Sequence, residues 1–213
     1  LKALSNIRST KSSSPEGSMA RKAKIVRKTT ETDIALEIDL DKTSGSKIDT
    51  TIPFLNHMLD LFSRHGLFKL VVKSTGDTEI DEHHLVEDLG ICLGKAFSEA
   101  LGDKKGINRY GSATVPMDES LCHVDLDISG RPYLIYKVKY ERRKIGGFDP
   151  ALVKEFFKAF TDHSGITLHI NLAYGSNSHH IIEAIFKAFA RALRQAVAQN
   201  PEISGVMSTK GTL

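Results

Sequence analysis

The pentapeptide HHLVE at residues 83–87 recurs as HHIIE at residues 179–183, 96 residues further along the chain. Imidazole nitrogens and carboxylate oxygens are common protein ligands of Mn, Fe and Zn, so the chain supplies the same candidate metal-binding cluster twice. If each copy lies on a helix, its first histidine and its glutamate share one face. The second histidine is turned about 100° away from the first. Neighbouring histidines therefore diverge, and they suit two different ions or one ion shared with another subunit.

The two copies belong to a longer internal repeat. Each is preceded by an amphipathic helical stretch that ends at His65-Gly or His163-Ser-Gly and then runs into an apolar strand. Aligning the halves on these two histidines places His57 opposite Glu155, which makes Glu155 a candidate ligand. The repeat therefore supports eight candidate metal ligands: His57, His83, His84, Glu87, Glu155, His179, His180 and Glu183. Eight ligands suit two ions of four each, with open positions for a substrate if the ions are octahedral.

Apolar periodicity predicts the same order of elements in both halves. In the first half we expect strands at 24–30, 34–40 and 46–51, a helix at 54–65, a strand at 67–72 and a helix at 82–101. In the second half we expect strands at 110–116, 121–128 and 133–140, a helix at 150–161, a strand at 166–172 and a helix at 178–198.

Three antiparallel strands, a helix, a strand and a helix, twice over, indicate an α+β fold of two fused repeats. Each repeat is expected to form a mixed or antiparallel sheet with two helices on one face, and the helices of the two repeats are expected to pack together. The repeats span residues 21–108 and 109–213 and form a single catalytic unit.

Composition and charge limit the classes of partner that the protein can have. Of the 213 residues, 26% are charged and 40% are apolar, which is typical of a globular protein. Residues 1–24 hold six Lys or Arg and one Glu, which leaves 23 basic and 25 acidic residues in the rest of the chain. The folded body therefore offers no electrostatic argument for a nucleic-acid partner. No apolar run approaches the roughly 20 residues that span a bilayer, so we expect no membrane partner.

The N-terminal residues 1–20 differ from the rest. The first 17 residues are rich in serine and basic side chains and contain one acid, Glu16. This composition is typical of the end of an organellar transit peptide, or of an unstructured tail. The first interpretation predicts a plastid (chloroplast) location, and the second a cytoplasmic one.

Basic residues in polar turns are candidate phosphate ligands. Arg109, Arg131 and Lys210 lie in turns that contain Gly, Ser or Asn. Lys187 lies about two helical turns beyond His180. Arginine and lysine in such places suit charge-assisted hydrogen bonds to phosphate, although their spacing does not place them together. They favour a small phosphorylated substrate that is held by its phosphate at one end.

Four blocks of the sequence closely resemble the imidazoleglycerol-phosphate dehydratase family of histidine biosynthesis. They are FLNHMLDLFSRHG at 54–66, DEHHLVEDLG at 81–90, GSNSHHIIEAIFKAFARALRQA at 175–196 and STKG at 208–211. The resemblance runs from about residue 21 to the C-terminus, and plant members resemble the blocks most. It implies a hydro-lyase that uses two Mn²⁺ per subunit to convert D-erythro-imidazole-glycerol phosphate into imidazole-acetol phosphate. It also implies a homo-oligomer of 24 subunits whose sites are completed by neighbouring chains.

The family's residue roles fall on matching positions. The resemblance implies that the eight candidate ligands hold manganese, although some relatives have histidine at the position of Glu155. It implies catalytic carboxylates at Glu31, Glu87 and Glu183, with Glu31 as an acid–base group. It implies substrate contacts from a further set: Glu31, His65, Arg109, Arg131, Lys187, Ser208, Thr209 and Lys210.

The implied reaction explains why a metal is needed. The proton removed lies on a carbon with no adjacent carbonyl, so the imidazole ring must act as the electron sink. A ring nitrogen bound to Mn²⁺ favours the imidazolate, which can expel the hydroxyl group while a carboxylate or bound water moves protons. Two alternatives remain: a dimetal phosphoesterase, which usually relies on Asp bridges, and a metal-storage protein, which needs no phosphate-binding cations.

Overall fold

The computed structural model describes residues 20–141 and 144–213. The segment 1–20, for which we expect a transit-peptide remnant or an unstructured tail, therefore lies outside the described residues except for Ala20. In the part of the chain that is described, no helix combines the length and the apolar character needed to cross a membrane.

The first half builds a four-stranded sheet. Its strands are β1 (Lys22–Lys28), β2 (Thr32–Asp39), β3 (Lys47–Asp49) and β4 (Lys69–Gly76), in the order β1-β2-β4-β3. β3 is parallel to β4, and the other two pairs are antiparallel. Helix α1 (Pro53–Gly66) joins β3 to β4 as the crossover that parallel neighbours require. Helix α2 (His83–Leu101) follows β4.

The second half repeats this topology. Its strands are β5 (Tyr110–Met117), β6 (Ser120–Asp127), β7 (Tyr133–Lys137) and β8 (Thr167–Tyr174), in the order β5-β6-β8-β7. Helix α3 (Leu152–Ser164) joins β7 to its parallel neighbour β8, and helix α4 (Ser178–Val197) ends the repeat. The expected α+β fold with two similar halves is confirmed.

The expectation of three consecutive antiparallel strands in each half is wrong for the third strand. β3 and β7 do not pair with β2 and β6, because β4 and β8 lie between them. A helix connects each third strand to the fourth, so the two run in the same direction. Apolar periodicity predicts that a segment is a strand, but it carries no information on which neighbour that strand will choose.

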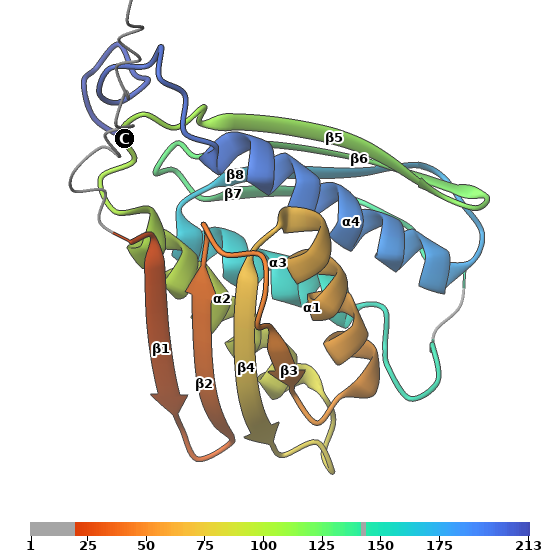
Figure 1. Cartoon of the computed structure of the whole chain (residues 1–213). Helices are drawn as coiled ribbons and strands as arrows, with labels where there is room; N and C mark the ends of the chain where they lie inside the picture. Colours follow the sequence, from red (N-terminus) through yellow and green to blue (C-terminus); the bar gives the residue numbers. More distant parts are fainter. Residues whose placement is uncertain (1–19, 142–143) are drawn as a thin grey trace, which may run out of the picture.

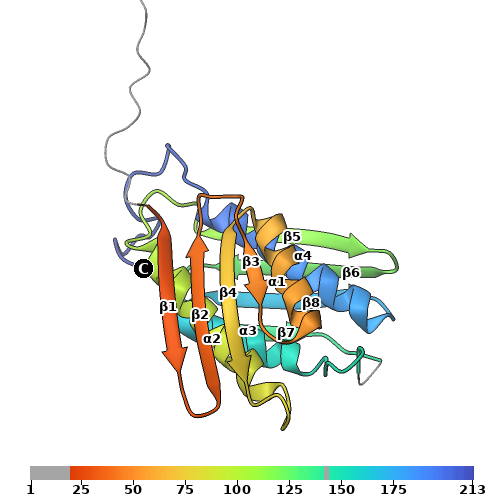
Figure 2. The same cartoon turned by 60° about the horizontal axis from the view of Figure 1, so that its bottom comes forward.

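The four helices lie between the two sheets (Figures 1 and 2). α2 covers the first sheet and α4 covers the second, while α1 packs on α4 and α2 packs on α3. The aromatic side chains interlock across the halves: the rings of Phe62 and Phe189 stack with centroids 5.6 Å apart, and those of Phe97 and Phe160 are 5.7 Å apart. One continuous apolar core therefore joins both repeats.

Two glycines allow α2 to lie unusually close to α3. A Cβ atom added at Gly90 would lie 2.5 Å from the carbonyl oxygen of Phe156, and one added at Gly94 would lie 2.6 Å from that of Phe160. Both obstacles are backbone atoms, which cannot turn aside as a flexible side chain can. Side chains at these positions would therefore push the two helices apart.

We expect Gly90→Ala to lower the free energy of unfolding by about 1–3 kcal/mol, because the added methyl group overpacks the contact between the helices. Gly147→Ala is the matched control, since a Cβ at Gly147 would meet nothing within 4 Å. Denaturant unfolding at one protein concentration measures both. Equal stability of the two variants would contradict the close approach.

Candidate metal centre and phosphate pocket

Both histidine pairs lie in the first turn of a long helix. The backbone N–H of His83 donates to Asp81 Oδ1 at 2.8 Å, and that of His179 donates to Asn177 Oδ1 at 3.0 Å. These polar side chains satisfy backbone donors that a helix leaves unpaired at its start. The local sequence therefore fixes where each helix begins and, with it, where each histidine pair projects.

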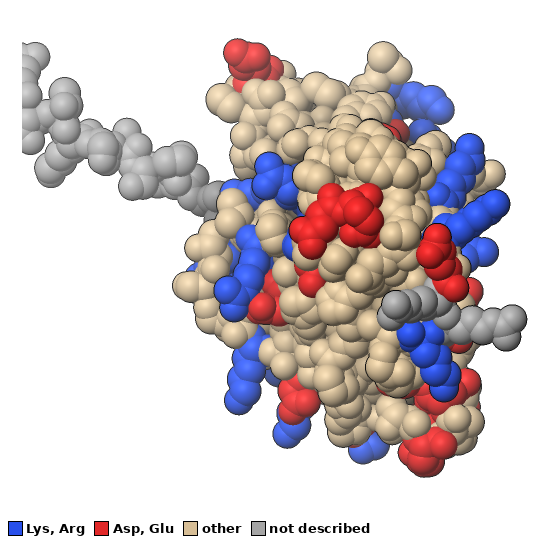
Figure 3. All heavy atoms as spheres, turned by 90° about the vertical axis from the view of Figure 1, so that its right-hand side faces the viewer, with Lys and Arg blue, Asp and Glu red and all other residues tan. Residues whose placement is uncertain are grey.

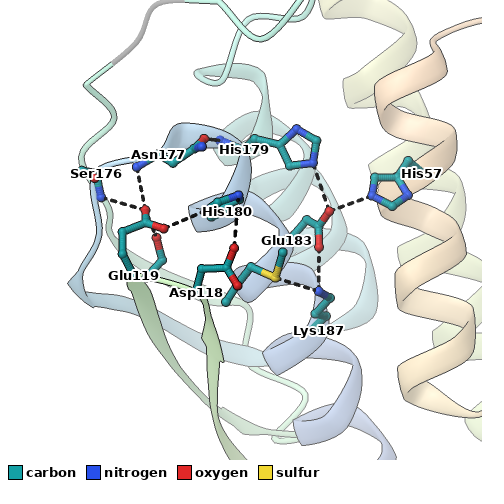
Figure 4. A network of polar contacts seen from close by, with 11 residues as sticks. His57, Asp118, Glu119, Ser176, Asn177, His179, His180, Glu183 and Lys187 are labelled. Carbon is teal, nitrogen blue, oxygen red and sulfur yellow. Dashed lines mark hydrogen bonds and ion pairs between the residues drawn. The ribbon is translucent and has the colours of Figure 1, made fainter.

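Three candidate ligands converge where α1 meets α4 (Figure 4). Nε2 of His57 lies 2.8 Å from Glu183 Oε1, and Nε2 of His179 lies 3.0 Å from the same oxygen. His179 and Glu183 share one face of α4, whereas His57 is carried there by the packing of α1 on α4. Their three ligand atoms all lie within 4.8 Å of one another. Residues from both repeats therefore form one cluster of two nitrogens and one oxygen.

The carboxylate of Glu183 is ionised although it is buried. Its residue is 7% exposed, and Lys187 Nζ donates to Oε2 at 2.6 Å. Burial opposes ionisation, but hydrogen bonds from Lys187, His57 and His179 prevail and lower the pKa of Glu183 to about 2. Oε2 is thus taken by the lysine while Oε1 faces the two imidazoles. An ionised oxygen and two imidazole nitrogens fit a divalent cation such as Mn²⁺, Fe²⁺ or Zn²⁺.

The corresponding ligands of the first repeat are gathered less closely. Nε2 of His83 lies 3.7 Å from Glu87 Oε2, both on α2. Glu155, the counterpart of His57, lies in the first turn of α3. Within residues 20–141 and 144–213, the cluster around Glu183 is the one group in which three ligand atoms meet, and Glu155 is not part of it.

The second histidine of each pair points away from the first. The two rings of the first pair are 6.1 Å apart and inclined by 85°, and those of the second pair are 6.2 Å apart and inclined by 79°. His84 Nδ1 lies 2.9 Å from Asp77 Oδ2, and His180 Nδ1 lies 2.7 Å from Glu119 Oε2. These hydrogen bonds raise the pKa of both histidines. Neither ring faces the cluster that contains Glu183.

Glu31 lies in the turn between β1 and β2 and reaches one of these histidines. Its Oε2 is 3.9 Å from His84 Nδ1, and its side chain is 51% exposed. Together with Asp77 it lines a pocket of about 310 Å³ at this end of the first sheet. The structure thus brings a carboxylate from the N-terminal hairpin to a candidate metal ligand on α2.

Five of the predicted substrate contacts line one pocket of about 680 Å³: Arg109, Arg131, Ser208, Thr209 and Lys210. The guanidinium of Arg109 is held by Asp127, to which Nε and Nη2 donate at 2.6 and 2.9 Å, and Nη1 donates to the carbonyl of Met207 at 2.7 Å. Arg131 is largely exposed, with Nη2 4.0 Å from Asp127. Arg109 therefore fastens the C-terminal segment, while Arg131 and Lys210 bring further positive charge to the pocket.

The other three predicted substrate contacts, Glu31, His65 and Lys187, lie outside this pocket. Lys187 is bound to Glu183, and His65 lies near it at the end of α1, where burial and then the charges of Lys187 and Arg191 lower the pKa of His65. The candidate phosphate pocket is at the C-terminal end of α4, because the N–H of Arg109 donates to the carbonyl of Ala196. At about 1.5 Å per residue, Glu183 and Ala196 are roughly 20 Å apart along α4.

Three acidic residues of these sites carry no signal in the motifs. Asp77, Glu119 and Asp127 orient His84, His180 and Arg109 respectively. Glu119 could have been found by aligning the hairpins of the two repeats, since it directly precedes β6 as Glu31 directly precedes β2. Asp77 aligns with Gly175, and Asp127 aligns with Asp39, which no motif singles out, so only the folded chain shows their partners.

Known proteins share both the sequence and the fold. The family model described as imidazoleglycerol-phosphate dehydratase matches residues 50–193. A protein of that name from Syntrophus aciditrophicus is 64% identical over 91% of this chain and 98% of its own length. The one from Geobacter sulfurreducens is 60% identical over 92% of this chain and its entire length.

Solved structures agree with these relatives. The crystal structure of imidazoleglycerol-phosphate dehydratase from Staphylococcus aureus has a TM-score of 0.78 and 43% identity, over 84% of this chain and 99% of its own. The structure of the Pyrococcus furiosus protein in complex with (S)-C348 has a TM-score of 0.77 and 38% identity, over 89% of this chain and all of its own. Because the likeness covers both repeats and nearly the full length of these proteins, the chain belongs to the imidazoleglycerol-phosphate dehydratase family.

Proposed function

We propose that the protein is a hydro-lyase that removes water from D-erythro-imidazole-glycerol phosphate and yields imidazole-acetol phosphate in histidine biosynthesis. The arrangement that carries the proposal is the pairing of a metal-binding cluster around the ionised Glu183 with a separate pocket of three cations. Such a protein can bind a nitrogen heterocycle and a phosphate at two different places. The names of the similar proteins supply the substrate.

The phosphate group of the substrate binds in the pocket at the C-terminal end of α4. Arg131 and Lys210 supply charge there, and the hydroxyl groups of Ser208 and Thr209 supply further donors. Charge-assisted hydrogen bonds of this kind are short and roughly twice as strong as neutral ones. Arg109 keeps the loop that carries these residues against β5 through its bond to the carbonyl of Met207.

The proposal includes two Mn²⁺ per chain, held by the eight candidate ligands. His57, His179 and Glu183 form one group within a single chain, and the diverging His84 and His180 serve ions that neighbouring chains share. Bound Mn²⁺ supplies Lewis-acid polarisation of a ring nitrogen, which makes the imidazole ring an electron sink. Lys187 keeps Glu183 ionised by its hydrogen bond to Oε2.

Glu31 moves the proton. Its carboxylate is exposed, lies beside His84 and lines a pocket, so it can reach both a bound substrate and solvent. A carboxylate placed in this way can accept a proton from the substrate and return it at a later step. Glu87 and Glu183, the other two candidate catalytic carboxylates, have the additional task of holding metal.

A complete site needs more than one chain. The metal cluster and the phosphate pocket lie roughly 20 Å apart along α4, at about 1.5 Å per residue, whereas an imidazole ring on a three-carbon phosphate chain is far shorter. A neighbouring chain must therefore bring its pocket to the cluster, which supports self-association, while the number of 24 subunits rests on the resemblance to the family alone. On the side that carries the N-terminal end of α4, acidic and basic side chains are interspersed and do not form one broad basic surface (Figure 3).

The plastid location remains a prediction from composition. The similar proteins named above come from bacteria and an archaeon, so they give it no support.

Activity measurements separate the candidate functions. With Mn²⁺ and imidazole-glycerol phosphate, we expect the full chain to form imidazole-acetol phosphate and to release no inorganic phosphate. A generic phosphate ester should remain intact. Phosphate release would identify a dimetal phosphoesterase instead, and Mn²⁺ binding without either reaction would identify a storage protein.

Substitution of Arg131 and substitution of Lys187 should affect Mn²⁺ binding differently. Arg131→Ala should weaken substrate binding by about 1.5–3 kcal/mol, or roughly 10- to 150-fold, and leave the Mn²⁺ content unchanged, because Arg131 contacts no candidate ligand. Lys187→Ala should lower both substrate binding and Mn²⁺ affinity, because it removes the hydrogen bond to Glu183. KM and metal content per chain measure the two effects. An unchanged KM in Arg131→Ala would place the phosphate elsewhere.

Removal of metal should reduce the assembly. Ligands shared between chains hold subunits together, so a chelator should lower the native mass and added Mn²⁺ should restore it. Light scattering during such a cycle makes the measurement. A stable, active monomer in the presence of Mn²⁺ would contradict shared ligands.

A further inference from the structure

The second histidines of both pairs use Nδ1 in the same way. His84 Nδ1 lies 2.9 Å from Asp77 Oδ2, and His180 Nδ1 lies 2.7 Å from Glu119 Oε2. A carboxylate is an acceptor, so the ring must donate its proton from Nδ1. The lone pair of a neutral imidazole then resides on Nε2, and this is how a carboxylate commonly orients a metal-binding histidine.

The two Nδ1–carboxylate contacts are not copies of one contact repeated in both halves. Glu119 lies in the β5–β6 turn, and its counterpart in the β1–β2 turn is Glu31. Asp77 follows β4, and the alignment of the repeats on His65 and His163 places Gly175 opposite it. The two halves therefore make the same contact with carboxylates from different positions. It is the histidine, and not the internal repeat, that requires a carboxylate partner.

Packing around Gly175 explains why the carboxylate of the second half comes from the β5–β6 turn. A Cβ atom added at Gly175 would lie 2.4 Å from Ser120 Oγ and 2.9 Å from Ser120 Cβ. No side chain fits there without displacing the start of β6, so a carboxylate at the position of Asp77 is sterically excluded. Glu119, the residue next to Ser120, supplies the carboxylate instead.

The surroundings of Glu119 hold it in place (Figure 4). Its Oε1 accepts from the backbone N–H groups of Ser176 and Asn177 at 3.2 and 2.8 Å and from Ser120 Oγ at 2.9 Å, which leaves Oε2 for His180. Glu31, by contrast, comes no nearer than 3.9 Å to His84 and is half exposed. The turn carboxylates of the two repeats therefore have different tasks.

One carboxylate oxygen of Asp77 is buried without a partner, and the contact of the other oxygen with His84 explains why Asp77 is found there. Its Oδ1 is buried and has no hydrogen-bond partner among the described residues. A buried polar atom without a partner disfavours folding and calls for a functional explanation. The hydrogen bond that Oδ2 accepts from His84 Nδ1 is that explanation, because it orients a candidate ligand rather than stabilising the strand end.

We propose that Asp77 and Glu119 are positioning residues that hold His84 and His180 with Nε2 presented to the metal ions. This inference rests on the proposed function, because it takes both histidines as metal ligands. It leaves Glu31 as the turn carboxylate that is available for proton transfer.

Mn²⁺ affinity of the full chain, measured by competition with a chelator of known affinity, tests the proposal. Glu119→Gln and Asp77→Asn should each bind Mn²⁺ about 10- to 100-fold more weakly, because an amide group no longer dictates which ring nitrogen carries the proton. Glu31→Gln is the matched control: it is the same change in the equivalent turn. It should keep the Mn²⁺ affinity while turnover falls by about 10²–10⁴-fold.

Two results would overturn the proposal. One is wild-type Mn²⁺ affinity in both Glu119→Gln and Asp77→Asn. The other is weaker Mn²⁺ binding by both variants together with lower thermal stability of the metal-free variants than of the metal-free wild type. That result would assign both residues to the fold. The activity of the wild-type protein is a separate measurement. If the wild type is active and both variants keep its Mn²⁺ affinity, only the positioning role is ruled out. If the variants bind Mn²⁺ more weakly but the wild type is inactive, only the proposed function is ruled out.

Discussion

The packing of α1 against α4 is the contact on which the metal-binding cluster depends. α4 alone can place a histidine and a glutamate on one face, but the third ligand, His57, comes from the other repeat. The same apolar core that joins the two halves therefore sets the distance between the ligands. Burial in this seam opposes the charge of Glu183, and Lys187 offsets that cost by a hydrogen bond to the oxygen that faces away from the histidines.

The two repeats share a topology and a ligand pattern but not their surroundings. His57 lies in a cluster of three candidate ligands, whereas its counterpart Glu155 lies in no such cluster among the described residues. Glu119 is bound by four donors, whereas its counterpart Glu31 is half exposed. The candidate ligands of the two repeats thus lie in unlike environments. That difference suits a reaction in which one side of the substrate loses a proton and the other loses a hydroxyl group.

Distance within the chain is the reason why the proposed function requires self-association. α4 is a straight helix with candidate metal ligands in its first turns and the candidate phosphate pocket at its last turn. Neither end can move toward the other, because α4 is buried between the second sheet and α1. Residues that must act on one small molecule can therefore meet only when chains are arranged side by side.

The sequence by itself determined the repeat, the helices that carry the histidine pairs and the residue types suited to metal and phosphate, because these depend on local periodicity and on chemistry. The divergence of adjacent histidines also follows from helix geometry alone. Tertiary structure decided that β3 and β7 lie beyond β4 and β8 and that His57 joins His179 and Glu183. It also decided that Asp77, Glu119 and Asp127 bind the candidate site residues His84, His180 and Arg109. Strand neighbours and contacts between distant residues arise from packing of the whole chain, which no local pattern encodes.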